Sequence, residues 1–220
     1  MNIIWHGHSC FEITGKDGTI VFDPYQANSV PGLNSLKLKA NLVLCSHEHD
    51  DHNAIHCVEV APKDFKVTCI ETYHDHHQGS HRGKNTIHIV DFENLKVVHM
   101  GDIGCMMDDV SKHVTLKSFG ATSTQCMMDD VSKLKNCDVL MIPIGGYYTI
   151  DTKEALKYIE RIQPRIVIPM HYHSHEFGYD VLSTNEEFIQ QSSSVTYVDD
   201  CLEVNKDTKT QTVVFKKPRN

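Results

Sequence analysis

Four short apolar runs in this 220-residue chain are each followed closely by histidine or aspartate. Runs of this length and composition are typical of buried β-strands. A strand end fixes the backbone of the next loop, and the loop lets neighbouring side chains turn inward together. The pattern therefore predicts a sheet with ligand-type side chains at its strand ends. The runs and their followers are 40–46 with 47–52, 66–71 with His74, 96–100 with Asp102, and 166–169 with His171.

The loop after the first run is the densest in metal ligands, because residues 47–52 read His-Glu-His-Asp-Asp-His. Imidazole and carboxylate suit zinc, manganese or iron, and the lack of cysteine in the motif argues against a closed structural zinc site. His47 and His49 can bind one ion, and Asp51 and His52 can bind a second ion about 3.5–4 Å away. The competing interpretation is a solvated polar loop that is merely rich in histidine.

A dinuclear site needs more ligands than this loop supplies, and His74, Asp102 and His171 are the candidates at the other strand ends. Asp23 ends another strand and could fix the second nitrogen of a metal-bound histidine. We prefer His74 and His171 to neighbouring histidines because they lie nearest their strands. The alternatives are His76, His77 and His81 beside His74, and His173 and His175 beside His171.

Chain length predicts one globular domain over residues 1–220, with two tightly fused halves as the alternative. The formal net charge of -8 argues against a broad nucleic-acid-binding surface. The eight cysteines contain no C-x-x-C pair, which fits buried thiols in a reducing compartment. We see no signal peptide and no apolar stretch near the ~20 residues of a membrane span, so a cytoplasmic location away from membranes is expected.

Turn formers and apolar spacing predict a mixed α/β chain. The clearest helix covers 152–163, where an apolar stripe runs from a cap at Asp151 or Thr152 to Pro164. Shorter helices are expected over 184–191 and 53–61. The expected strands are 11–14, 19–22, 40–46, 66–71, 86–91, 95–100, 138–144, 165–169, 196–198 and 212–215.

One eight-residue segment occurs twice, because Cys105–Lys112 recurs letter for letter as Cys126–Lys133. The residues between the copies do not repeat, so the chain is not a solenoid. We interpret residues 105–125 as a local insertion or duplication of 21 residues. It begins close behind Asp102 and could be a substrate lid, an oligomer contact or a passive bulge. The passive bulge is favoured, because long surface insertions cost little free energy.

The order of the ligand-type residues resembles the metallo-β-lactamase superfamily. Residues 47–52 fit its H-x-H-x-D-H signature, and a lone histidine, a Gly-Asp pair and a late histidine follow in the same order. Other segments resemble its L-ascorbate-6-phosphate lactonase-like branch, which is often described only as predicted zinc-dependent hydrolases. These segments are 5–11, 23–24, 79 with 82–86, 101–104, 143–146 and 169–172, so the resemblance covers nearly the whole chain. It departs from the family at residues 105–125.

The resemblance implies a four-layer αββα sandwich with a dinuclear metal site at one edge. It assigns His47, His49 and His74 to one divalent ion, Asp51, His52 and His171 to a second, and Asp102 as the bridge. Zinc is the implied metal, with manganese as the alternative, and a metal-activated hydroxide is the implied nucleophile. Asp51 is also a candidate to accept or return a proton. His8, in a Gly-His-Ser segment that approaches the site in the family, is a candidate substrate-binding or proton-relay residue.

Three functions compete. The leading hypothesis is a hydrolase acting on a small molecule that could be anionic, such as a lactone, an ester or a phosphorylated sugar acid. The second is a phosphodiesterase or nuclease, which the negative charge and the lack of an added nucleic-acid-binding domain disfavour. The third is a non-catalytic metal-binding protein, disfavoured because all seven candidate ligands are retained. Histidine at position 49 also argues against a redox diiron site. A homo-oligomer is compatible with the sequence, which leaves oligomeric state and substrate open.

Overall fold

The computed structural model describes residues 1–106 and 131–219. Short strands dominate these residues, as the sequence predicts. In chain order the elements are β1 (Asn2–Gly7), β2 (Cys10–Gly15), β3 (Gly18–Phe22), β4 (Leu38–Ala40), β5 (Leu42–Leu44), the 3-10 turn η1 (Ile55–Cys57), β6 (Val58–Val60), β7 (Lys66–Tyr73), β8 (Lys84–Phe92), β9 (Leu95–His99), the 3-10 turn η3 (Val131–Leu134), β10 (Val139–Pro143), α1 (Thr152–Ile162), β11 (Ile166–Met170), α2 (Glu186–Gln191), β12 (Val195–Val198), β13 (Cys201–Glu203) and β14 (Gln211–Phe215).

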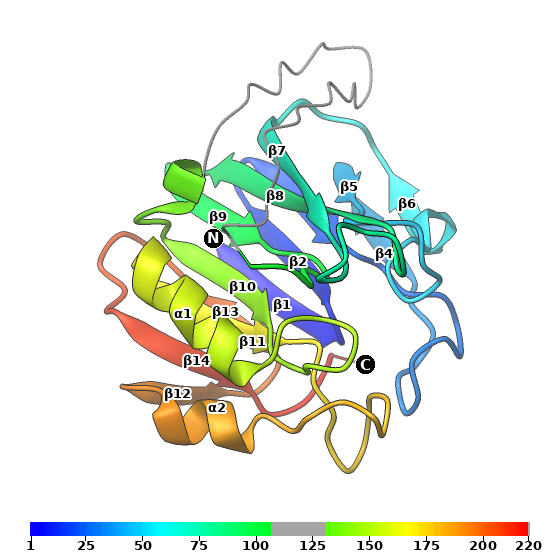
Figure 1. Ribbon diagram of the computed structural model, residues 1–220. Coiled ribbons are helices and arrows are strands. Elements are labelled where there is room, and N and C mark those ends of the chain that lie inside the picture. Colours follow the sequence, from blue (N-terminus) through cyan, green and yellow to red (C-terminus); the bar gives the residue numbers. More distant parts are fainter. Residues whose placement is uncertain (107–130, 220) are drawn as a thin grey trace.

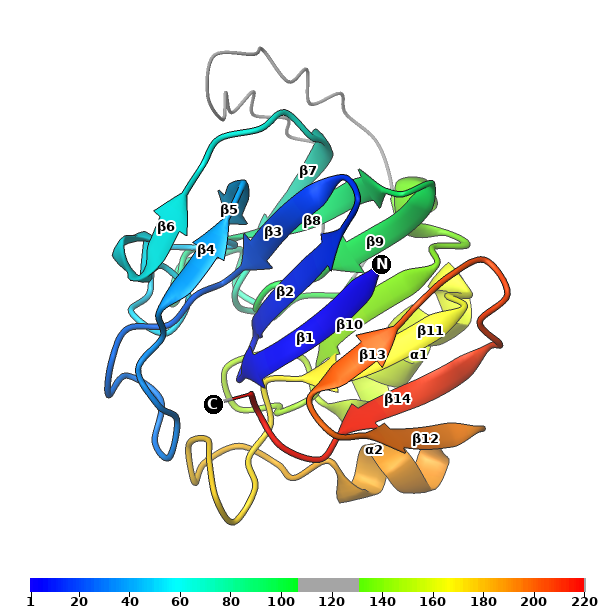
Figure 2. The same ribbon diagram turned by 180° about the vertical axis from the view of Figure 1, so that it is seen from behind.

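Within the described residues, two large sheets pack face to face, and helices α1 and α2 cover the outer side of one of them (Figures 1 and 2). The first sheet has the strand order β13-β1-β2-β3-β5, and the second has the order β12-β14-β11-β10-β9-β8-β7. The α/β sandwich is thereby confirmed. The outer face of the first sheet is covered by the small β4–β6 sheet and the loop before it, which bury Cys10, Val21 and Tyr25.

Alternation of side chains along β3 shows how one strand serves two layers. Ile20 and Phe22 belong to the core between the sheets, whereas Val21 packs on the outer side against the β4–β6 layer. This period of two is the geometry of an extended strand. By contrast, β10 and β11 are buried at every position and pair in parallel. A continuous apolar run is expected where a parallel sheet is covered on both faces.

Helix α1 confirms the clearest helical prediction. Asp151 caps its N-terminus by accepting a hydrogen bond from the Glu154 backbone N–H, and the Glu154 carboxylate accepts one from the Asp151 N–H. This capping box satisfies two backbone donors that would otherwise lack partners. The apolar stripe of α1 is buried against the seven-stranded sheet through Ala155, Tyr158 and Ile162.

Two predictions between residues 38 and 61 need correction. The strand expected over 40–46 is two short strands broken at Asn41, which bonds to Thr19 through its backbone and side chain and donates its amide to the Ala61 carbonyl. The chain therefore changes partner from β6 to β3 at this residue. The helix expected over 53–61 is only the turn η1, because Val58–Val60 pairs with β4 as strand β6.

The remaining predicted elements are found with boundary shifts of a few residues, and strands β1, β6 and β13 are additional. Most of the insertion expected at 105–125 lies outside the described residues. None of the helices in residues 1–106 and 131–219 has both the length and the apolar character needed to cross a membrane.

Candidate metal centre

The ends of strands β5, β7, β9 and β11 bring the candidate ligands together. His47, His49, Asp51 and His52 lie in the loop after β5, His74 follows β7, Asp102 follows β9 and His171 follows β11. Three overlapping groups of side chains each place one potential ligand atom per residue within 4.8 Å of the others. They are His47, His49 and His74; His8, Asp51, His52 and His171; and His47, His52 and Asp102.

The first group, which we call the three-histidine cluster, consists of His47, His49 and His74. The centroid of the His47 ring lies 4.5 Å from that of His49 and 4.7 Å from that of His74. Burial lowers the pKa of His47 to about 3 and that of His74 to about 4, so both imidazoles are neutral near pH 7. A neutral imidazole keeps a lone pair for a metal ion.

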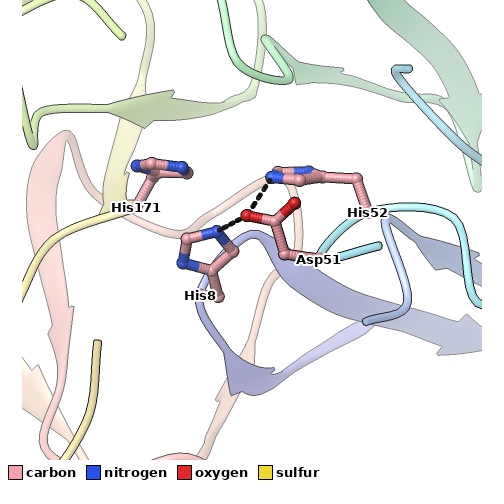
Figure 3. A group of neighbouring side chains, drawn as sticks. All are labelled: His8, Asp51, His52 and His171. Carbon is pink, nitrogen blue, oxygen red and sulfur yellow. Dashed lines mark hydrogen bonds and ion pairs between the residues drawn. The ribbon is translucent and has the colours of Figure 1, made fainter. Parts of the chain in front are cut away.

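The second group, which we call the four-residue cluster, consists of His8, Asp51, His52 and His171 (Figure 3). The Asp51 carboxylate lies between two of its histidines, with Oδ2 3.2 Å from His8 Nε2 and 3.7 Å from His52 Nε2. The rings of His8 and His171 are 4.1 Å apart. Burial and the neighbouring His171 lower the pKa of His8 to about 4.

Asp102 lies between the two clusters. Its Oδ2 atom is 3.2 Å from His52 Nε2, 3.5 Å from His74 Nε2 and 2.9 Å from His171 Nε2. Burial would raise the pKa of this carboxyl, but His171 and His52 hold it well below its ordinary value. An ionised carboxylate that reaches histidines of both clusters has the position that a bridging ligand requires.

Asp23 and Ser46 fix the orientation of one histidine in each cluster. His52 Nδ1 donates to Asp23 Oδ2 at 2.8 Å, which leaves Nε2 directed toward Asp102. The Ser46 hydroxyl donates to the same carboxylate oxygen at 2.6 Å, so its own oxygen accepts from His47 Nδ1 at 2.9 Å. Both rings therefore present Nε2 to the interior of the site, the arrangement that metal-bound histidines show in proteins.

Buried polar atoms without a hydrogen-bond partner show whether the two clusters and Asp102 fit metal cations. His47 Nε2, His52 Nε2 and Asp102 Oδ1 are buried without a hydrogen-bond partner among the described residues. Buried polar atoms are rarely left so, and metal coordination is one way to satisfy them. Burial lowers the pKa of His52, yet the carboxylates of Asp102 and Asp51 raise it well above its ordinary value. The carboxylates thus favour positive charge at this place, and the donor set fits divalent ions.

Asn85 is a supporting residue that the sequence did not reveal. Its side-chain Oδ1 accepts a hydrogen bond from the Asp102 N–H at 2.8 Å, and its Nδ2 donates to the Met100 carbonyl and to Thr72. A Cβ at Gly101 would lie 2.3 Å from Asn85 Oδ1, so only glycine fits beside it. Residues 82–86 resemble the lactonase-like branch, but nothing in that resemblance gives Asn85 a role, because it lies inside β8 and contacts the site through the Asp102 backbone.

Tyr179 is a second residue absent from the predicted site. Its hydroxyl lies 2.7 Å from the Ser29 carbonyl oxygen and 3.3 Å from Asp51 Oδ2. Tyr179 lies eight positions after His171. That is too far from the end of β11 for it to be recognised as a residue that follows a strand. The alternative ligands His76, His77, His81, His173 and His175 are absent from the three ligand groups found among the described residues.

Comparison with known proteins agrees with a site that fits divalent metal ions. Residues 2–171 match the family model described as the beta-lactamase superfamily domain. A UPF0173 metal-dependent hydrolase of Staphylothermus marinus is 33% identical over 189 residues, covering 76% of this chain and 82% of the relative. A UPF0173 metal-dependent hydrolase of Thermoplasma acidophilum is 26% identical and covers 85% of this chain and 88% of its own.

A solved structure extends the likeness to the fold. A candidate zinc-dependent hydrolase of the metallo-β-lactamase superfamily from Thermotoga maritima has a TM-score of 0.69 and 27% sequence identity, with 97% of each chain covered. The matched residues 2–171 include every member of both clusters and Asp102. The chain belongs to the metallo-β-lactamase superfamily.

Proposed function

We propose that this protein binds two divalent metal ions at the two clusters and hydrolyses a small-molecule ester, lactone or phosphorylated compound. That it is a metal-dependent hydrolase follows from its family, whose curated members and solved neighbour carry that name. The observation that carries the dinuclear proposal is the position of Asp102, whose carboxylate oxygen lies within 3.5 Å of histidines from both clusters.

Each ion has its own set of residues in this proposal. His47, His49 and His74 would hold one ion, and Asp51, His52 and His171 would hold the other, with Asp102 between them. Zinc suits this set of imidazoles and carboxylates, and manganese is the alternative. When bound, such ions supply an activated water and polarise the oxygen of the bond to be broken.

Asp51 and His8 are the residues we propose for proton transfer. The Asp51 carboxylate accepts a hydrogen bond from His8 Nε2 at 3.2 Å and lies 3.3 Å from the Tyr179 hydroxyl. Burial would raise the pKa of Asp51, but His52 and His8 lower it below its ordinary range, so the group is ionised near pH 7. The ionised carboxylate can take up a proton, and His8 takes part by holding the carboxylate through the Nε2–H bond, since that nitrogen already carries a proton.

A phosphodiesterase or nuclease activity is the second candidate, on superfamily grounds alone. The net charge of -8 disfavours a large nucleic-acid footprint, and we place the substrate among small molecules. A non-catalytic metal protein is the third candidate. It would leave unexplained the proton-transfer group of Asp51, His8 and Tyr179 beside the clusters.

The test is a hydrolysis screen on protein loaded with zinc or manganese, using lactones, thioesters and bis-phosphodiesters. We expect Asp102→Asn and His49→Ala to lower kcat/KM by at least about 100-fold, since each removes a proposed metal ligand. The matched control is His56→Ala, an exposed histidine outside the clusters, which should keep wild-type rates. Full hydrolysis and full metal content in Asp102→Asn would overturn the proposed site.

A further inference from the structure

The loop of residues 75–83 carries an arginine to the neighbourhood of the metal centre. The Gly83 carbonyl accepts a hydrogen bond from the His74 backbone N–H, which ties the end of the loop to a candidate metal ligand. Buried Asp75 organises the loop by accepting four backbone N–H bonds, including that of Arg82 at 2.8 Å. The Arg82 backbone is therefore fixed close to the three-histidine cluster.

The Arg82 side chain is held by an aromatic ring instead of a carboxylate. Its guanidinium carbon lies 5.5 Å from the centroid of the Tyr148 ring, within the range of a cation–π contact. Among the described residues it forms no ion pair, whereas the nearby cation Lys84 is paired with Glu71 at 2.6 Å. Stacking occupies the face of a guanidinium and leaves its N–H donors, which lie in the plane, free for another group.

A series of ring contacts connects Arg82 to the four-residue cluster. The ring of Tyr148 packs edge-on against that of Tyr179 at 6.0 Å, and the Tyr179 hydroxyl lies 3.3 Å from Asp51 Oδ2. Tyr148 also packs edge-on against Tyr147, which is 58% exposed. Arg82 is thus linked indirectly to both clusters, through the Gly83–His74 backbone bond and through Tyr148 and Tyr179.

Arg82 is the uncompensated charge beside a loaded site. Two divalent ions would carry four positive charges, which the three carboxylates of Asp23, Asp51 and Asp102 and one hydroxide would balance. Arg82 adds a further positive charge beside this centre, in a protein whose formal net charge is -8. A local positive region of this kind attracts anionic small molecules even where the whole molecule is acidic.

We propose that Arg82 and Tyr148, which we call the Arg82–Tyr148 wall, bind an oxyanion group of the substrate, either a phosphate monoester or a carboxylate. This inference rests on the proposed hydrolase function and narrows its substrate class to anionic small molecules. The guanidinium edge binds the oxyanion in a bidentate manner, as arginine does with phosphate and carboxylate. Tyr148 holds the guanidinium in place, and the exposed ring of Tyr147 contacts the uncharged part of the substrate.

The experiment compares matched pairs of lactones that differ only in the group at C6, which is neutral in one member and charged in the other. D-glucono-1,5-lactone and its 6-phosphate test a phosphate, and D-glucono-1,4-lactone and D-glucaro-1,4-lactone test a carboxylate. Holoenzyme turnover is followed by proton release, corrected for spontaneous hydrolysis. We expect wild type to prefer a charged member, and Arg82→Gln to raise KM for it by about 10- to 100-fold with little change in kcat. Rates on the neutral members should stay within about twofold.

Two further variants separate recognition from structure. Tyr148→Leu should reproduce part of the Arg82→Gln effect, because the guanidinium loses its support. Lys84→Gln removes a cation two residues away, at the start of β8, and should match wild type on all four lactones. Equal losses of turnover on charged and neutral lactones in Arg82→Gln would show a structural role and contradict the proposal. No loss on any lactone would contradict it as well.

A binding measurement keeps the wall testable if no lactone is hydrolysed. Calorimetric titration of the metal-loaded protein with 6-phosphogluconate, gluconate and glucarate compares ligands that differ at C6 only. Wild type should bind a ligand charged at C6 more tightly than gluconate, and Arg82→Gln should lose that preference. If Arg82→Gln keeps the wild-type preference for ligands charged at C6, the proposed role of the Arg82–Tyr148 wall is wrong. If that preference depends on Arg82 but no lactone is hydrolysed, only the proposed lactone hydrolysis is wrong.

Discussion

Asp23 has influence over both clusters although it belongs to neither. One carboxylate oxygen accepts from His52 directly and from the Ser46 hydroxyl, which in turn accepts from His47. The sequence predicted Asp23 as a partner for a single metal-bound histidine, because it ends a strand. Its link through Ser46 to a second histidine depends on the parallel pairing of β3 with β5, which no local pattern reveals.

Asp23→Asn should therefore weaken metal binding at both clusters, by about 10- to 100-fold each, since an amide can no longer accept from both donors and fix both rings. Ser46→Ala is the matched variant, and we expect it to weaken the three-histidine cluster much more than the four-residue cluster. Competition with a coloured chelator measures both affinities. Equal effects of the two variants would contradict this account of the hydrogen-bond network.

Asn85 and Tyr179 mark the limit of residue-level prediction. Histidine and aspartate after apolar runs could be found because their chemistry is rare and their position at strand ends is regular. Asn85 acts through one hydrogen bond to the Asp102 backbone, and Tyr179 through its hydroxyl near Asp51. Asparagine and tyrosine are common in strands and loops, so only the packed structure distinguishes them.

At the scale of elements, long periodic segments were predicted well and short strands poorly. Helix α1 has an apolar stripe, a capping box and a terminating proline, and these signals agree. The stretch of residues 38–61 has none of them. Its strands are three residues long and depend on partners elsewhere in the chain, so Val58–Val60 could not be recognised as a strand from local propensity.

Asp138, immediately before β10, joins three segments of the chain and gives a pH-dependent prediction. Its carboxylate accepts from the Lys96 backbone N–H at 2.8 Å and from Arg165 Nη2 at 2.9 Å. Burial would raise its pKa, but the Lys96 and Arg165 bonds lower it below the ordinary value. Asp138→Asn should reduce the free energy of unfolding at pH 7 by about 1–3 kcal/mol.

Because the folded-state pKa of Asp138 is lowered, its stabilisation is complete above pH ~4 and is lost as the pH falls through the folded value. Urea unfolding of wild type and Asp138→Asn at pH 7 and pH 3 should show the difference shrinking in acid. Asp199→Asn is the control, since its pair with Lys216 is exposed and should contribute less than about 1 kcal/mol. A difference that grows in acid would contradict the assignment.

For the whole molecule, the site links the two sheets. His8 comes from the β1–β2 turn and Asp51 from the loop after β5, both in the five-stranded sheet, while His74, Asp102 and His171 follow strands of the seven-stranded sheet. The sequence predicted the sandwich and the ligand set through the order of motifs. It could not predict which sheet supplies which ligand, because strand order is set by tertiary pairing.

Metal ions that bind residues of both sheets should stabilise the fold. Ions at about 100 times their dissociation constant add about 2.7 kcal/mol per site if they bind only the folded state. We expect removal of both metal ions by a chelator to lower Tm by about 10–20 °C in scanning calorimetry, and zinc or manganese to restore it. An unchanged Tm in protein shown to be metal-free would contradict a site that links the sheets.

The account depends most on two ions, one at each cluster, with Asp102 between them. Elemental analysis of purified wild type and of His49→Ala, His171→Ala and Asp102→Asn, after dialysis against a weak chelator, measures this directly. We predict two ions per chain in wild type, about one in each histidine variant, and reduced occupancy of both sites in Asp102→Asn. One ion per chain in wild type, or two in all three variants, would contradict the dinuclear centre.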